Sequence, residues 1–112
     1  MYILVKKSIP LGLAMNSAAH ASLACFREYE DNRMMQAWID SPHFRKATCW
    51  VDDNDFEKAK TFDKHIVMTE NSLGGEETAI AFCPREEWPK FFNFLQLYGK
   101  GFYLTEKIDV GF

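Results

Sequence analysis

Residues 8–25 read SIPLGLAMNSAAHASLAC, and they follow directly on the apolar run YILVK at residues 2–6. The apolar run is typical of a buried strand, so we predict a strand there and a helix over residues 12–26. Small residues recur on one stripe of that helix, at Ala14, Ala18, Ala21 and Cys25. Because no side chain on this stripe is larger than cysteine, we expect the helix to lie unusually close to the sheet.

The rest of the chain alternates between helix and strand signals and ends in a tail of strand-forming residues at 100–112. Caps, prolines and turn residues bound the further expected elements: helices at 31–40 and 52–60, strands at 44–51, 63–69 and 77–83, and a last helix at 86–98. Strand–helix–strand connections favour parallel neighbours, and the closing hairpin adds one antiparallel strand. We therefore predict a single α/β domain over residues 1–112, with a mixed four-stranded sheet, helices on both faces and the order βααβαββα.

Composition restricts the class of protein. Hydrophobic residues make up 47% of the 112 residues and aromatic residues 15%, which excludes a disordered chain. No apolar stretch approaches the roughly 20 residues that a membrane-spanning helix needs, and the features of a signal peptide are missing from the start. We therefore expect a cytoplasmic protein that does not associate with a membrane.

Cysteine and histidine spacings favour neither a disulfide framework nor a metal centre. Cys25, Cys49 and Cys83 lie far apart and form no C-x-x-C pair, so we expect buried free thiols. The three histidines share no metal-ligand spacing. We expect no metal and no cofactor.

The topology indicates where a ligand would bind. If the first three strands run parallel, their carboxyl ends share one edge of the sheet, which is where open α/β sheets bind ligands. That edge would collect Lys6, Lys7, the loop 8–16, Asp52, Asp53 and the turn 70–75. The helix starts near Gly12 without a strong side-chain cap, so its first amides are open to an anion or to solvent. The net charge of −3 does not favour nucleic acid, so a tRNA ligand would need a local basic patch.

Three stretches together resemble the peptidyl-tRNA hydrolase II superfamily, over nearly the whole chain up to about Gly99. They are LGLAMNSAAHA with Gly12, Ala19, His20 and Ala21; FRKATCWVDDNDFEKAK with Lys46; and GGEETAIAFCP with Gly75, Thr78 and Pro84. The resemblance implies that family's fold, and its enzymes hydrolyse an ester linked to tRNA. Where those enzymes carry lysines in the first turn, this chain has Leu11 and Leu13, and the loop before the last strand is shortened to ENSLGG at 70–75. The chain is in this respect more similar to an uncharacterised bacterial branch of the superfamily.

The resemblance and the sheet edge lead to three hypotheses of function. The first is a hydrolase of an ester or amide linked to tRNA or a related adduct. In this hypothesis Lys6, Lys7 and the backbone amides at Gly12 bind phosphate groups. His20 and Thr78 orient the reacting groups, and Glu70 acts as the general base. The second is a non-catalytic module that binds a small anion or metabolite in the same crevice. The candidate binding residues of the crevice are Lys6, Lys7, Gly12, Asn16, Lys46 and Asn71. The third is an enzyme that uses this crevice for a different substrate.

Each candidate residue also has a structural interpretation. His20 lies on the flank of the helix, at the boundary of its buried stripe. A structural histidine in such a place donates to a backbone carbonyl. Thr78 suits a cross-strand pair and Lys46 a solvated strand end, while Asp52 and Asp53 suit a cap of the next helix. Glu76 and Glu77 are neighbours on a strand, so alternation predicts that only one of them faces the site.

The aromatic content bears on assembly. Ten phenylalanines and three tryptophans are many for a domain of this size, so we expect some apolar surface to stay exposed. The tail GFYLTEKIDVGF at 101–112 is suited to covering a neighbouring subunit. We therefore predict a homodimer.

Overall fold

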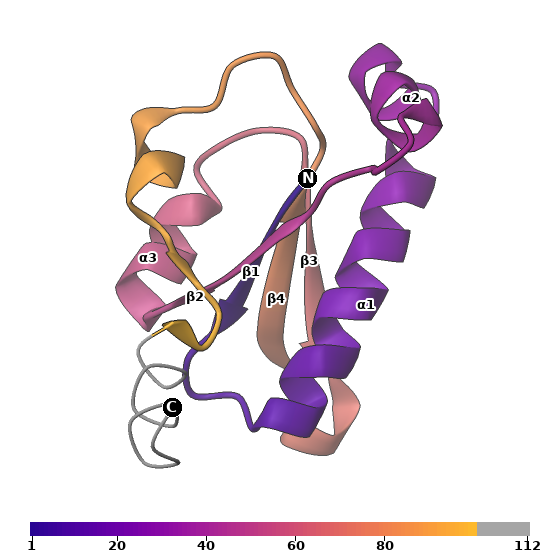
Figure 1. The fold of residues 1–112 in the computed structure, drawn as a ribbon. Helices are drawn as coiled ribbons and strands as arrows, with labels where there is room; N and C mark the ends of the chain where they lie inside the picture. The colour runs from indigo at the N-terminus through magenta and orange to yellow at the C-terminus, as the bar shows by residue number, and fades with distance from the viewer. Residues whose placement is uncertain (101–112) are drawn as a thin grey trace, which may run out of the picture.

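The computed structural model of the protein describes residues 1–100 (Figure 1). The tail at 101–112, which we expected to contact a neighbour, lies outside the described residues. In chain order the elements are β1 (Tyr2–Lys6), α1 (Leu11–Glu28), α2 (Arg33–Asp40), β2 (Ala47–Val51), α3 (Asp53–Ala59), β3 (His65–Glu70), the 3-10 turn η1 (Asn71–Leu73), β4 (Glu76–Phe82), the 3-10 turn η2 (Lys90–Phe94) and β5 (Gln96–Leu97). The described chain is a single α/β domain, and its elements from β1 to β4 follow the predicted order.

The strands form one mixed sheet in the order β3-β4-β1-β2-β5. β1 and β2 are parallel, while β4 lies antiparallel to both β1 and β3. Because two antiparallel steps separate β3 from β1, the strands β1, β2 and β3 all run in the same direction. Their carboxyl ends therefore share one edge of the sheet, as predicted.

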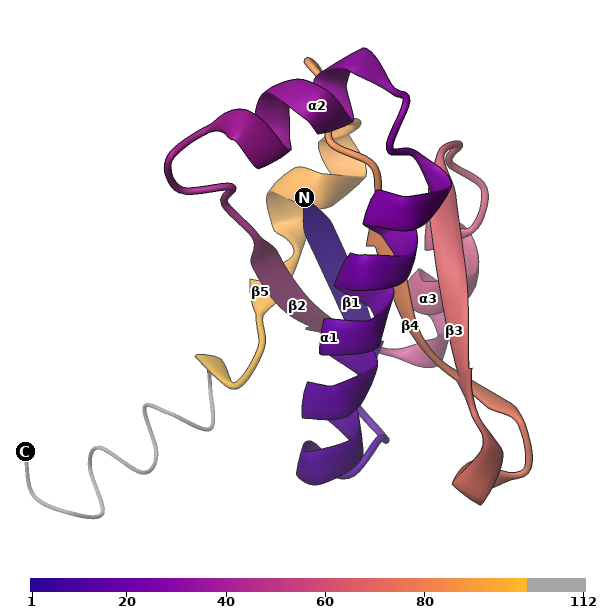
Figure 2. The same cartoon turned by 90° about the vertical axis from the view of Figure 1, so that its right-hand side faces the viewer.

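Helices cover both faces of this sheet, also as predicted (Figures 1 and 2). The first core lies between the sheet and the helices α1 and α2. Its buried members are Met1, Ile3, Val5, Ile9, Ala14, Ala21, Cys25, Met35, Ala79, Ala81 and Cys83. The second core lies on the α3 side, and its buried members are Leu4, Val51, Phe56, Ala59, Ile80, Phe82 and Phe92. Large aromatic side chains are thus concentrated on the face that α1 does not cover.

The small-residue stripe of α1 faces the sheet. Ala21 and Cys25 are fully buried and Ala14 almost so, against Ala79 and Ala81 of β4. The approach is close enough for two short side chains to meet, since the hydroxyls of Ser17 and Thr78 lie 2.9 Å apart. Small residues on both surfaces therefore set the spacing between helix and sheet.

The predicted last helix over residues 86–98 is wrong, and with it the prediction of four strands. Pro89 adopts an extended ψ of 153° and opens only the short turn η2. Phe92 of η2 is buried among the rings of Tyr2, Trp88 and Phe82, with centroids 4.9 to 5.1 Å away. β5 then pairs with β2 as a fifth strand. The contacts of Phe92 with Tyr2 and Phe82 join distant parts of the chain, so no local helical pattern predicts them.

Other boundaries are set by caps. The Oδ1 atom of Asn32 accepts hydrogen bonds from the amides of Met34 and Met35, so α2 begins after it. Asp52 caps α3 by accepting from the Asp55 amide at 2.8 Å, as predicted, whereas Asp53 is the first residue of that helix. Within the described residues no helix has the length and apolarity to cross a membrane.

The three cysteines are free and buried, as expected. Burial raises the pKa of the Cys25 thiol to about 12 and that of Cys49 to about 11. The pKa of Cys83 is raised by the same cause. All three thiols therefore stay protonated and unreactive near neutral pH.

We predict that Ala21→Leu destabilises the protein by about 1–3 kcal/mol, because a leucine at the fully buried centre of α1 must push the helix away from the sheet. Ala19→Leu, on the exposed side of the same helix, is the matched control and should change stability by less than about 0.5 kcal/mol. Urea unfolding measures both. Equal stability of the two variants would contradict the close packing of α1.

Candidate functional site

The carboxyl edge of the sheet gathers some of the expected site residues but not all. Lys6 ends β1 and Lys7 follows it, while Glu70 ends β3 and Asn71 follows it at the same edge. Lys46 precedes β2 and therefore lies at the opposite edge, where the next amide, of Ala47, donates to the carbonyl of Met1. Its ammonium nitrogen lies 6.0 Å from the ring of Phe44. The structure does not bring Lys46 to the other candidates, because parallel strands begin on the same side of a sheet.

The ammonium group of Lys6 is enclosed by protein groups. Only 14% of its side chain is exposed, with Nζ 4.0 Å from Oε1 of Glu76 and 4.9 Å from the centre of the Phe56 ring. Lys60 lies 5.5 Å from the same ring and pairs with both Glu57 and Glu77. The hydrogen bonds that Lys60 donates to Glu77 and to Glu57 raise its pKa, that to Glu77 the most. Glutamates of the chain therefore already neutralise the positive charges of Lys6 and Lys60, which a phosphate group would need for binding.

A bulge in β4 sets the position of Thr78. The pairing of β3 with β4 shifts register between Met68 and Thr69, whose partners are Ala79 and Glu77, so Thr78 is an extra residue in its strand. The shift interrupts the alternation of side chains at Thr78. Glu76 and Glu77 both precede the bulge, and each lies near a lysine, Glu76 near Lys6 and Glu77 near Lys60.

Thr78 is a packing residue between α1 and the sheet. It is fully buried, and its hydroxyl donates to the Ser17 hydroxyl at 2.9 Å, with the Met68 carbonyl oxygen at 3.5 Å. Such a group has no access to a substrate. The bulge directs this hydroxyl into the helix–sheet interface.

Glu70, at the end of β3, lies near His20 of α1. Oε1 of Glu70 accepts hydrogen bonds from the amide and the hydroxyl of Ser72, at 3.2 and 3.0 Å. These bonds lower the pKa of Glu70, and the nearby His20 lowers it further. His20, Asn16 and Asn71 are all exposed. The carboxylate therefore stays ionised at neutral pH but is a weaker base than an unbonded glutamate.

The first turn of α1 has no side-chain cap, as the sequence predicted. Pro10 occupies the cap position, and the Ala14 amide donates to its carbonyl at 2.8 Å. Leu11 is 61% exposed, whereas Leu13 packs against the first core. Gly12 is exposed, and a side chain added there would point into open space. Of Leu11 and Leu13, Leu11 is therefore the more exposed to solvent.

Lys7 lines a groove that contains no residue of α1. Its Nζ lies 5.8 Å from the Trp50 ring, at a polar groove of about 240 Å³ that also contains Asp52 and Phe94. A larger open groove, of about 500 Å³, lies between α3 and η2 on the other face of the sheet. That groove contains none of the residues that the sequence singled out.

An apolar groove between α1 and β2 was not predicted from the sequence. Its volume is about 370 Å³, and it is lined by Val5, Ala14, Met15, Ala18, Thr48 and Tyr98. Ala14 and Ala18 belong to the small-residue stripe of α1, so the stripe was the signal for this hollow. The short side chains of Ala14 and Ala18 leave this space between α1 and β2.

No protein-family model matches the chain, and no curated protein matches it. Within residues 1–100 no group of three or more histidine, cysteine, aspartate or glutamate side chains is arranged to hold a metal ion.

We predict that Thr78→Val, which keeps the shape of the side chain, destabilises the protein by about 1–3 kcal/mol because it leaves the buried Ser17 hydroxyl without its partner. Adding Ser17→Ala should recover part of this loss, since both polar groups are then gone. Thr69→Val, the same change at an exposed position of β3, is the control. A double-mutant cycle of urea unfolding measures the coupling, and additive effects would contradict the contact.

Proposed function

We propose that the protein is a non-catalytic module of the cytoplasm that binds a small, largely apolar molecule in the groove between α1 and β2. The observation that carries the proposal is the floor of that groove, which Val5, Ala14 and Ala18 build from short side chains. A volume of about 370 Å³ lies in the range of small-ligand sites. The three free cysteines fit a reducing compartment.

The lining of the groove suggests the chemistry of its ligand. Val5, Met15 and the two alanines provide apolar contact, whereas Thr48 and Tyr98 each bring a hydroxyl. Few polar groups in an apolar pocket usually orient a ligand without reacting with it. A flat or short-chain molecule with one hydrogen-bonding group suits this arrangement better than the small anion that the sequence first indicated.

The state of the expected catalytic residues supports binding over hydrolysis. The Thr78 hydroxyl is buried against Ser17, and the ammonium of Lys6 is paired with Glu76. Glu70 accepts two hydrogen bonds from Ser72 and has a lowered pKa, which weakens it as a general base. For the fold, the element order from β1 to β4 supports our expectation of a peptidyl-tRNA hydrolase II-like domain.

We expect Ala18→Leu to weaken binding of the dye 1-anilinonaphthalene-8-sulfonate, whose aromatic rings bind apolar surfaces, by at least about tenfold, because the larger side chain fills the groove. Ala19→Leu, on the neighbouring exposed position, should bind the dye as the unaltered protein does. Fluorescence titration measures the affinity, and circular dichroism checks that both variants fold. Equal affinity of the two variants would place the dye elsewhere and remove the proposal.

A hydrolase acting on an ester or amide linked to tRNA is the second candidate, because His20 and Glu70 lie on the same side of α1 and its first turn is uncapped. Incubation of peptidyl-tRNA with a large excess of protein tests it directly. We expect no release of peptide above background. Release that His20→Ala abolishes would replace the binding module by the hydrolase.

A further inference from the structure

The strand β3 is the outermost strand on one side of the sheet, so it is an edge strand. It pairs with β4 on one side, and no other strand of the described chain pairs with it on the other (Figure 2). Residues 66–69 of this edge carry no charge and no proline, which are the usual means of protecting an edge strand. An edge of this kind is suited to pairing with another strand.

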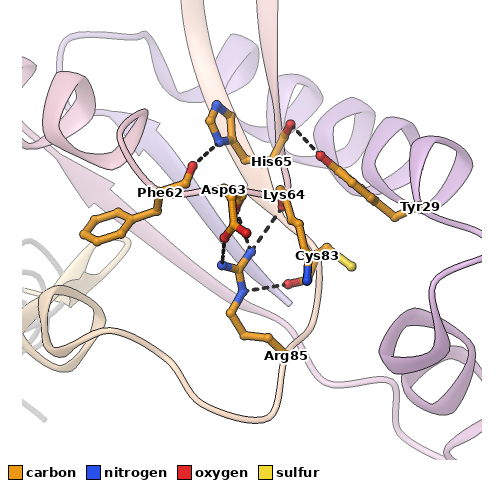
Figure 3. A network of polar contacts seen from close by, with 7 residues as sticks. All are labelled: Tyr29, Phe62, Asp63, Lys64, His65, Cys83 and Arg85. Carbon is orange, nitrogen blue, oxygen red and sulfur yellow. Dashed lines mark hydrogen bonds and ion pairs between the residues drawn. The ribbon is translucent and has the colours of Figure 1, made fainter.

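Hydrogen bonds identify the residues whose backbone faces outward. The Cys83 amide donates to the Lys64 carbonyl at 2.9 Å, so the backbone groups of even-numbered residues point toward β4. Those of His65, Val67 and Thr69 therefore point away from the sheet. The His65 carbonyl agrees, because it accepts a hydrogen bond from the Tyr29 hydroxyl rather than from β4 (Figure 3).

We propose that β3 pairs antiparallel with β3 of a second copy of this chain, with the twofold axis at Val67. Only outward-facing residues can exchange backbone hydrogen bonds, so Val67 meets Val67 of the other copy and His65 meets Thr69. A carbonyl oxygen has two lone pairs, so His65 can keep its bond to Tyr29. This interface is independent of the groove proposed to bind a ligand.

Charge complementarity supports a second copy as the occupant. In this register Lys64 of each copy lies opposite Glu70 of the other, which gives two oppositely charged pairs at the two ends of the ladder. Lys64 is exposed, and within residues 1–100 it has no ion pair of its own. Ser72 occupies only the Oε1 atom of Glu70, so the second carboxylate oxygen is available.

The backbone at Lys64 supplies a further argument. Its φ of 56° is a left-handed conformation that glycine adopts more readily than lysine. Arg85 holds this conformation by donating to the carbonyls of Asp63 and Lys64, at 2.9 and 3.2 Å, while pairing with the Asp63 carboxylate at 3.1 Å (Figure 3). The lysine side chain has no other role in the described structure that would account for its presence there, and the interface gives it one.

Charge exchange tests the register. The unaltered protein should sediment as a dimer at micromolar concentration, and Lys64→Glu and Glu70→Lys should each weaken the dimer by at least about tenfold. The double variant should restore it, whereas the control Lys90→Glu, at another exposed lysine, should leave it unchanged. Melting curves of the same samples show whether each variant is folded. A monomeric unaltered protein, or a folded Lys64→Glu variant that dimerises normally, would overturn the proposal.

Two further variants separate the interface from folding. Lys64→Gly should raise the melting temperature, because it relieves the left-handed backbone, and still weaken the dimer. Val67→Cys should form a disulfide between copies on mild oxidation, since the two α-carbons would lie about 5.5 Å apart. Thr69→Cys, which faces His65 of the other copy, should not. Equal cross-linking of the two cysteine variants would exclude this register.

Discussion

The close contact of α1 with β4 is the constraint on which the rest of the structure depends. Ala21 and Cys25 of the helix face Ala79 and Ala81 of the strand, so neither surface has a long side chain to separate the layers. Large residues must then pack elsewhere, and the α3 side of the sheet contains Phe56, Phe82 and Phe92. The apolar groove beside β2 has the same origin, because methyl groups of α1 leave space wherever the opposite strand is not covered.

The bulge in β4 connects this packing to the chemistry of the sheet edge. It places Thr78 in contact with Ser17 of α1, which satisfies both hydroxyls inside the interface. Just before the bulge, Glu77 pairs with Lys60 and Glu76 lies near Lys6. The lysines of this edge thus stabilise the junction of α3, β1 and β4 around the Phe56 ring. An edge that looked suited to a phosphate is occupied by carboxylates of the chain itself.

Local patterns predicted the part of the fold that local interactions determine. The apolar run of β1, the alanine stripe of α1 and the cap Asp52 act within a few residues of the elements that they define. The region from Pro84 to Leu97 could not be predicted in this way, because Phe92 takes its position from Tyr2 and Phe82. For the site, strand direction correctly brought Lys6 and Glu70 to one edge. The packing role of Thr78 could not be predicted, because it depends on a bulge that no local sequence pattern marks.

The two ends of the sheet differ in a way that separates ligand binding from assembly. At one end β5 covers part of β2, and Tyr98, which follows β5, lines the groove. At the other end β3 is unpaired on its outer side, and Arg85 holds a lysine there in a conformation that favours glycine. β4 and β1 lie between these two ends. Pairing through β3 would therefore join two sheets at the ends remote from their grooves, so that both copies could bind a ligand without disturbing the interface.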